Sequence, residues 1–119
     1  MAKRKNNAII HKPDEKSVYR VIDNYISELK KHNVDLYSVY LFGSYAKGTS
    51  SDWSDIDLAV VVNKFTGDGK NIGDAIDFMS FLMKIANSNY IEPHPILKDD
   101  FNETYPFALE ILKTGKKIL

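Results

Sequence analysis

The sequence of 119 residues contains no cysteine. Structural disulfides, zinc sites built from thiolates and catalysis by a thiol nucleophile are therefore excluded. A chain without cysteine suits a reducing compartment, and we predict a cytoplasmic location.

Long apolar runs are also lacking. No segment approaches the roughly 20 consecutive apolar residues that a membrane helix needs. The N-terminal stretch MAKRKNNAII lacks the apolar core of a secretory signal. We therefore expect no membrane segment and no signal peptide.

The sequence has no excess of charge of either sign, because 16 basic residues balance 16 acidic ones. A neutral chain has no broad positive field, so nucleic acid is not an expected partner. Basic residues gather only near the start, at Lys3, Arg4 and Lys5. We interpret residues 1–13 as a flexible basic arm rather than a nucleic-acid-binding segment.

The remaining composition is that of an ordinary globular protein, with 44% hydrophobic and 27% charged residues. A chain of this length suits one compact domain and is too short for two. We assign that domain to residues 14–119.

Hydrophobic periodicity predicts elements in the order helix–strand–strand–helix–strand–helix. The connection between the first two strands is too short for a parallel crossover, so these strands are expected to be antiparallel neighbours. The expected fold class is therefore α/β or α+β, a mixed β-sheet with flanking helices. The expected helices cover residues 14–32, 72–86 and a segment from Asn102 or Thr104 to Lys113, the expected strands cover 36–42, 55–62 and 90–97, and the loops cover 43–54, with room for one helical turn, and 63–71.

Two aspartates stand at the start of the second expected strand. Asp55 and Asp57 are two residues apart, so their side chains point to the same face, with Cα atoms about 6.6–6.8 Å apart. Two carboxylates at this separation can converge on one divalent cation or bracket a pair. Oxygen ligands of this kind suit Mg²⁺, with Mn²⁺ as a substitute.

The first expected strand ends at Gly43 and Ser44. A glycine at this turn lets the backbone approach a ligand closely, and the serine adds a hydroxyl beside exposed N–H donors. Lys47 follows three residues after Ser44, where it can contact a phosphate or serve only as surface charge. Phosphoryl transfer needs such a phosphate cradle facing metal-binding acids.

The spacing of these residues, Gly43-Ser44, ten residues and then Asp55-Ile56-Asp57, resembles the nucleotidyltransferase superfamily with the polymerase-β-like palm fold. The motif and its flanks cover residues 36–62, and the resemblance extends from about residue 14 to the C-terminus. The length is similar to that of the minimal nucleotidyltransferases. The resemblance implies a metal-dependent enzyme that transfers a nucleotidyl group, adenylyl in the first instance, from ATP or another nucleoside triphosphate to an acceptor hydroxyl.

The family normally uses a third carboxylate from a later strand, and the candidate is Glu92. It would complete the metal site or act as general base toward the acceptor hydroxyl. We predict that Glu92 shares the sheet face of the aspartates, although Pro93 and Pro95 favour an edge strand or a bulge that would change its face. His94 is interpreted as a structural residue rather than a catalyst.

The resemblance also implies an alternative function. Minimal nucleotidyltransferases of the MntA antitoxin type often sit beside a small all-helical protein in toxin–antitoxin pairs, where they transfer adenylyl groups to the partner or mask it. The second hypothesis is therefore a binding module that neutralises a small helical partner, with a vestigial or regulatory nucleotide site. Association between copies of the chain is compatible with both hypotheses.

Overall fold

The computed structural model describes residues 16–50, 55–87 and 90–119. The predicted basic arm, residues 1–13, lies outside the described residues, and so do residues 51–54 of the first predicted loop. The described elements are α1 (Val18–Lys31), β1 (Leu36–Phe42), α2 (Gly43–Lys47), β2 (Ile56–Val62), β3 (Thr66–Gly67), β4 (Lys70–Asn71), α3 (Ala75–Ala86), β5 (Ile91–Leu97), the short 3₁₀ helix η1 (Lys98–Asp100), α4 (Pro106–Thr114) and β6 (Lys116–Lys117).

The main sheet is mixed, in the strand order β5-β2-β1-β6. Strands β1 and β2 pair antiparallel, as the short connection between them predicts. Strand β5 pairs parallel to β2 and forms one edge of the sheet. An edge position suits Pro93 and Pro95, because a proline has no N–H to donate to a further strand. The predicted fold class, a mixed sheet with flanking helices, is confirmed.

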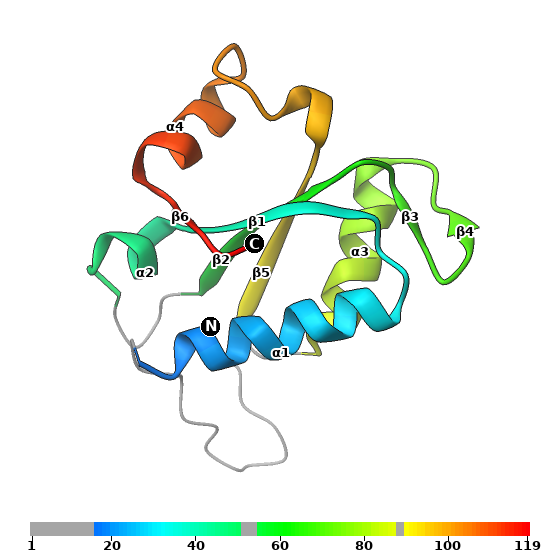
Figure 1. Ribbon diagram of the computed structural model, residues 1–119, viewed down its shortest axis with the longest axis horizontal. Coiled ribbons are helices and arrows are strands. Elements are labelled where there is room, and N and C mark those ends of the chain that lie inside the picture. The colour runs from blue at the N-terminus through cyan, green and yellow to red at the C-terminus, as the bar shows by residue number, and fades with distance from the viewer. Residues whose placement is uncertain (1–15, 51–54, 88–89) are drawn as a thin grey trace.

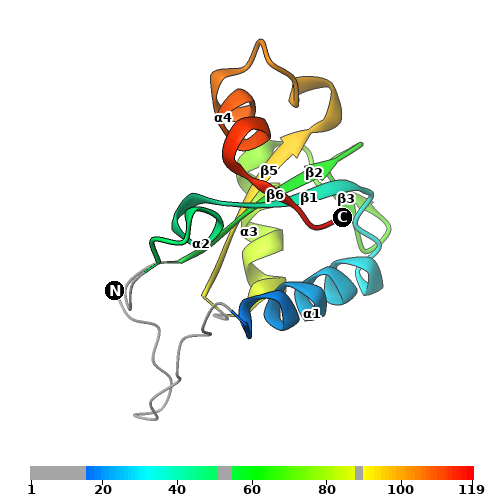
Figure 2. The same ribbon diagram turned by 60° about the vertical axis from the view of Figure 1, so that its left-hand side comes forward.

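Helices cover both faces of this sheet. Figures 1 and 2 show α1 and α3 on one side and α4 on the other. The apolar pattern of β2 follows from this arrangement, because Leu58 and Val60 pack toward α1 and α3 while Ala59 and Val61 pack with Ile111 of α4. Strands buried on both faces read as continuous apolar runs rather than as alternating ones.

The polar start of β2 is the exception to this burial. The residues from Leu58 to Val62 are all fully buried, whereas Asp57 is half-buried. Desolvation of an unpaired carboxylate is costly, so Asp57 is tolerated only at the strand end, where α4 no longer covers the sheet completely. The main sheet is therefore apolar except at the edge where Asp57 lies.

The helix α1 has its apolar residues at three- and four-residue spacing on the buried face, as predicted, but it begins at Val18, because Lys16 and Ser17 of the predicted helix form a turn. Its Tyr25 hydroxyl donates a hydrogen bond to the Leu82 carbonyl oxygen at 2.8 Å and so ties α1 to α3. Burial raises the pKa of this tyrosine far above its ordinary value. Among the described residues, no helix is both long enough and apolar enough to cross a bilayer.

The prediction for the second helix was wrong at its start. Helix α3 begins at Ala75 rather than at Ile72, because the Asp74 side chain caps it by accepting a hydrogen bond from the Asp77 N–H at 2.9 Å. The apolar spacing in the sequence predicts that Ile76, Leu82 and Ala86 lie on the buried face of this helix. Leu82 and Ala86 are buried, together with Phe78, which was not predicted, whereas Ile76 is 79% exposed.

The C-terminal elements also differ from expectation. The predicted caps Asn102 and Thr104 form a turn of their own, in which the Asn102 side chain accepts a hydrogen bond from the Thr104 N–H at 2.9 Å. Helix α4 begins later, at Pro106, and ends at Thr114, one residue after the predicted end at Lys113. Strand β6 was not predicted, because two exposed lysines show no hydrophobic alternation; its pairing with β1 depends on α4 returning the chain to that edge.

Candidate functional site

Three strand ends meet at the polar edge of the sheet. Because β1 and β2 are antiparallel, the end of β1 lies beside the start of β2, and Phe42 pairs with Asp57. Because β2 and β5 are parallel, their starts also lie together, and Asp57 pairs with Glu92. The topology thus brings Gly43, Asp57 and Glu92 to one place, although Glu92 lies far along the chain from the other two.

The side chains of Asp57, Glu92 and His94 converge there. One potential ligand atom from each lies within 4.8 Å of those of the other two. The His94 Nε2 atom lies 3.3 Å from Asp57 Oδ1 and 3.7 Å from Glu92 Oε2. The three side chains remain accessible, with exposed fractions of 24% for Asp57, 41% for Glu92 and 28% for His94. We refer to these three residues as the strand-end cluster.

His94 is the residue that sequence reasoning undervalued. It was interpreted as a structural histidine, yet its ring lies in the cluster, with its centroid 5.0 Å from the Phe42 ring and 5.9 Å from the Phe107 ring. The sequence did indicate this position, because His94 follows Glu92 by two residues in the same strand and therefore lies on the same face of the sheet.

Asp55 is not a member of the cluster. It immediately precedes β2 and is half-buried. Its carboxylate nevertheless acts on the cluster, because its negative charge contributes to raising the pKa of Glu92. The assignment of Asp55, Asp57 and Glu92 as metal ligands stays a prediction.

The pKa of Glu92 is raised above the ordinary value of 4.5. Burial is the largest cause, followed by the hydrogen bond with Asp57 and repulsion by the Asp57 charge, while His94 acts in the opposite direction. Crowded carboxylates repel one another, and a cation between them relieves this repulsion. The chemistry of the donor set therefore fits a divalent cation.

In metal-free protein, Glu92→Gln is expected to raise the melting temperature at pH 7 and to leave it unchanged at about pH 3.5. A raised pKa in the folded state means that folding favours protonated Glu92. That stabilisation is present below the ordinary pKa of 4.5 and is lost as the pH rises through the higher folded value. Thermal denaturation in a chelator at both pH values checks this, with Glu103→Gln, at an exposed loop position, as the control. A difference in melting temperature between Glu92→Gln and the parent protein that grows toward acid pH would contradict this expectation.

Gly43 is required by its contacts as well as by its backbone. Its φ is +73°, a left-handed conformation, and a Cβ atom at this position would overlap Oδ2 of Asp57. Gly43 begins the short helix α2, so the predicted helical turn is present in this loop. Ser44 follows it and is half-buried, and its carbonyl oxygen accepts a hydrogen bond from the Thr49 N–H at 2.9 Å. The nucleotide-binding roles of Gly43 and Ser44 stay predictions.

Lys47, at the end of α2, has a protein partner. Its Nζ atom lies 3.6 Å from Glu110 Oε2 of α4, with both side chains at least half exposed. An exposed ion pair of this kind contributes at most about 1 kcal/mol and breaks readily. The pair is compatible with both readings of Lys47, and a phosphate contact stays a prediction.

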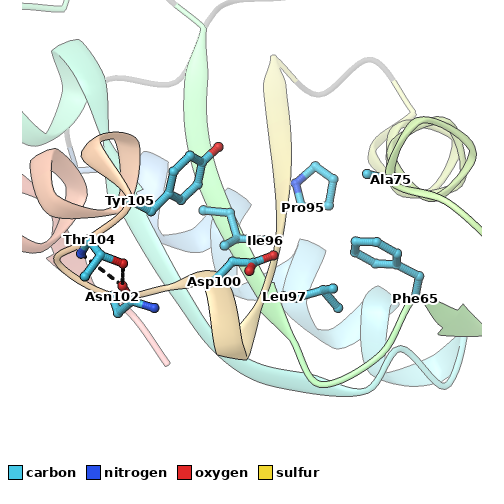
Figure 3. A pocket seen from close by; sticks show the side chains of 9 residues that line it. All are labelled: Phe65, Ala75, Pro95, Ile96, Leu97, Asp100, Asn102, Thr104 and Tyr105. Atoms are coloured by element: carbon cyan, nitrogen blue, oxygen red, sulfur yellow. Dashed lines mark hydrogen bonds between the residues drawn. The ribbon is translucent and has the colours of Figure 1, made fainter.

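A pocket of about 430 Å³ lies away from the strand-end cluster. It follows the other end of β5, between the start of α3 and the segment that leads into α4 (Figure 3). Pro95, Ile96 and Leu97 line its centre, and Ala75 and Tyr105 lie on either side. The cluster, in contrast, lies at the starts of β2 and β5, so the pocket and the candidate site are separate features.

The fold and the strand-end site together define a nucleotidyltransferase-type domain, in which a mixed sheet places carboxylates beside a Gly-Ser turn. Comparison with known families bears this out. The family described as Polymerase beta, Nucleotidyltransferase matches residues 24–119, and the chain therefore belongs to this family.

A curated relative is found in Methanocaldococcus jannaschii. It is named as a candidate protein adenylyltransferase and is 45% identical over 49 residues. The match covers 40% of this chain and 33% of that relative, so it spans only a third of the relative's length.

Two solved structures share the fold. A crystal structure of a toxin–antitoxin with AMP-PNP matches with a TM-score of 0.55 and 25% identity, over 83% of this chain and 70% of that chain. A mutant of the MntA–HpeT toxin–antitoxin also has a TM-score of 0.55, with 24% identity over 82% of this chain and 71% of that one. The second likeness supports the fold alone.

Proposed function

We propose that this chain is a metal-dependent adenylyltransferase that transfers AMP from ATP to a hydroxyl group of a partner protein. The observation that carries the proposal is the convergence of Asp57 and Glu92 beside the Gly43 turn in a chain of the nucleotidyltransferase family. The adenylyltransferase name of the M. jannaschii relative supports a protein acceptor. The AMP-PNP in the first solved structure supports ATP as the nucleotide.

The residues of the chain divide into two groups in this proposal. The carboxylates Asp57 and Glu92, with Asp55 beside them, hold the cation. Gly43 and Ser44 contact the triphosphate through their backbone N–H groups and the serine hydroxyl, and Lys47 leaves Glu110 to contact a phosphate. A bound divalent cation supplies charge neutralisation for the triphosphate.

The chemistry that these residues would serve is an in-line displacement. The acceptor oxygen forms a bond to the α-phosphorus, the bond from that phosphorus to the bridging oxygen breaks, and pyrophosphate leaves with the electron pair. The hydroxyl proton passes to solvent. The protein contributes positioning and electrostatic stabilisation, which suits a site made of carboxylates and a close backbone approach rather than of a nucleophile.

Binding of ATP is expected to require a divalent cation. Without one, the triphosphate and the carboxylates of Asp57 and Glu92 repel each other at short range. Isothermal calorimetry of ATP with Mg²⁺, with Mn²⁺ and with chelator checks this. We expect affinity to fall at least about tenfold in chelator, a loss of about 1.4 kcal/mol. Equal binding in all three conditions would contradict a metal-bridged site.

A partner-binding module is the second candidate function. The specific observation in its favour is that the solved structure with AMP-PNP is a toxin–antitoxin. In this case the partner is held whether or not transfer occurs. A small helical protein encoded next to this chain is the first partner to test, by co-purification with the parent protein and with Asp57→Asn. Retention of the partner by both proteins to the same extent supports masking. Transfer is supported if the partner becomes labelled from ATP carrying the label in its α-phosphate, and if this happens with the parent protein but not with Asp57→Asn.

A further inference from the structure

The strand-end cluster contains a nitrogen donor as well as oxygen donors. Two of its members are carboxylates, and the third is the imidazole of His94, on the strand that also carries Glu92. A site for Mg²⁺ is normally built from oxygen ligands, with water completing the octahedron. Because the imidazole can bind the same ion as the two carboxylates, it changes which metal the site prefers.

The distances from His94 Nε2 to the two carboxylates are closer to those between ligand atoms of one metal ion than to those of hydrogen bonds. The hydrogen bond between His94 Nε2 and Asp57 Oδ1, at 3.3 Å, is longer than the usual range of about 2.7–3.2 Å, and Nε2 lies 3.7 Å from Glu92 Oε2. Ligand atoms about 2.1 Å from one ion lie about 3.0–4.2 Å from each other. Both measured distances fall within that interval.

The ring of His94 is held in place by its surroundings. The Phe42 ring meets it edge-on at a centroid distance of 5.0 Å, and the Phe107 ring of α4 lies 5.9 Å away. Its backbone is fixed by the β2–β5 pairing, in which Ala59 lies opposite His94. A ligand held by rigid strands and packed aromatic rings loses little conformational freedom when it binds a metal.

We propose that His94 Nε2 is a metal ligand, and that the cluster therefore prefers a first-row transition metal such as Mn²⁺ or Co²⁺ to Mg²⁺. The inference rests on the proposed metal site but not on the transfer reaction. Among the transition metals, affinity for a site of nitrogen and oxygen ligands rises from Mn²⁺ to Co²⁺. Mg²⁺ gains little from an imidazole and keeps its waters. The parent protein is expected to bind Co²⁺ at least ten times more tightly than Mg²⁺.

The test is direct metal binding to the full chain, free of nucleotide. Calorimetry with Co²⁺ and with Mg²⁺ compares the parent with His94→Gln, in which an amide oxygen replaces the nitrogen donor. We expect Co²⁺ affinity to fall at least tenfold and Mg²⁺ affinity to change less than threefold. The control is His32→Gln, because His32 is paired with Asp68 away from the cluster, at 3.0 Å. It should change neither affinity.

A spectroscopic measurement on the parent protein keeps the inference testable if His94→Gln fails to fold. Pulsed electron paramagnetic resonance of the Mn²⁺-loaded protein, labelled with ¹⁵N-histidine, should show coupling to a ligated nitrogen. The absence of this coupling, or unchanged Co²⁺ affinity in a folded His94→Gln protein, overturns the role of His94 and leaves the proposed function standing. A parent protein that binds none of the three metals overturns the proposed metal site itself.

Discussion

Asp57→Asn is expected to reduce nucleotidyl transfer at least about a hundredfold while leaving the fold intact. Asp57 is the centre of the strand-end cluster, because it pairs with Glu92 in the sheet and contacts His94 through Oδ1. Removing a single oxyanion-hole donor from an enzyme costs a factor of about 10²–10³, and we expect the loss of a metal-binding charge to cost at least as much. An amide of the same size keeps a hydrogen-bond acceptor but removes the charge that a cation needs.

The stability of this variant should move in the other direction. In metal-free protein, the loss of the Asp57 charge relieves repulsion with Glu92, so the melting temperature is expected to stay constant or rise slightly. A clear fall would mean that Asp57 is chiefly a structural hydrogen-bond acceptor.

The activity is measured with ATP labelled in the α- or the γ-phosphate, in separate reactions with candidate acceptor proteins. Protein-bound label from α-labelled ATP, with none from γ-labelled ATP, identifies nucleotidyl transfer and excludes a kinase reaction. Asp23→Asn is the matched control, since it removes the same charge from an exposed position of α1. It should retain full activity, and retention of activity by Asp57→Asn would contradict the assigned role.

Gly43→Ala is expected to destabilise the fold by about 2–4 kcal/mol and to abolish metal–nucleotide binding. A φ of +73° costs an alanine about 1–2 kcal/mol, and crowding adds a similar amount because the new Cβ atom would overlap Oδ2 of Asp57. The overlap can be relieved only by moving the Asp57 carboxylate or the turn. Either movement separates the backbone of Gly43, which we propose contacts phosphate, from Asp57, the proposed metal ligand.

Gly48→Ala separates the two causes of this loss. Gly48 has nearly the same φ, +72°, but among the described residues no atom beyond its two chain neighbours lies within 4 Å of a Cβ placed there. It should cost about 1–2 kcal/mol through backbone strain alone and leave ATP binding unchanged. Urea denaturation and calorimetry of both variants provide the comparison. Equal stabilities, with ATP binding retained in both, would show that the contact between Gly43 and Asp57 is unimportant.

Several features of the candidate site follow from the sequence alone. Local signals suffice for the first two strands, because a short polar connection between two apolar runs requires an antiparallel pair. Burial of the run that follows Asp57 requires the aspartate to lie at the exposed end of its strand. That Glu92 shares a sheet face with the aspartates was predicted as well, since a carboxylate in an apolar strand must face a polar cleft, whereas the parallel pairing of β5 with β2 was not predicted.

Other features depended on tertiary structure. Alternation along β5 places His94 on the same face as Glu92, but whether that face holds a metal ligand or a core residue depends on which helix covers it. Here α4 packs Ile111 over Ala59 and Val61 and leaves the side chain of Asp57, the second residue of β2, partly accessible. The contact that requires glycine at position 43 lies between the first residue of α2 and Asp57 of β2, so no local pattern reveals it.

The sequence by itself thus determined the class of fold, the strand ends and the acids that stand on them, because hydrophobic periodicity and turn residues act over a few positions. Tertiary structure alone decided that Asp57, rather than the pair Asp55 and Asp57, is joined with Glu92 and His94. The physical reason is that side-chain convergence depends on strand register and on helix packing, which are set by contacts between residues far apart in the chain.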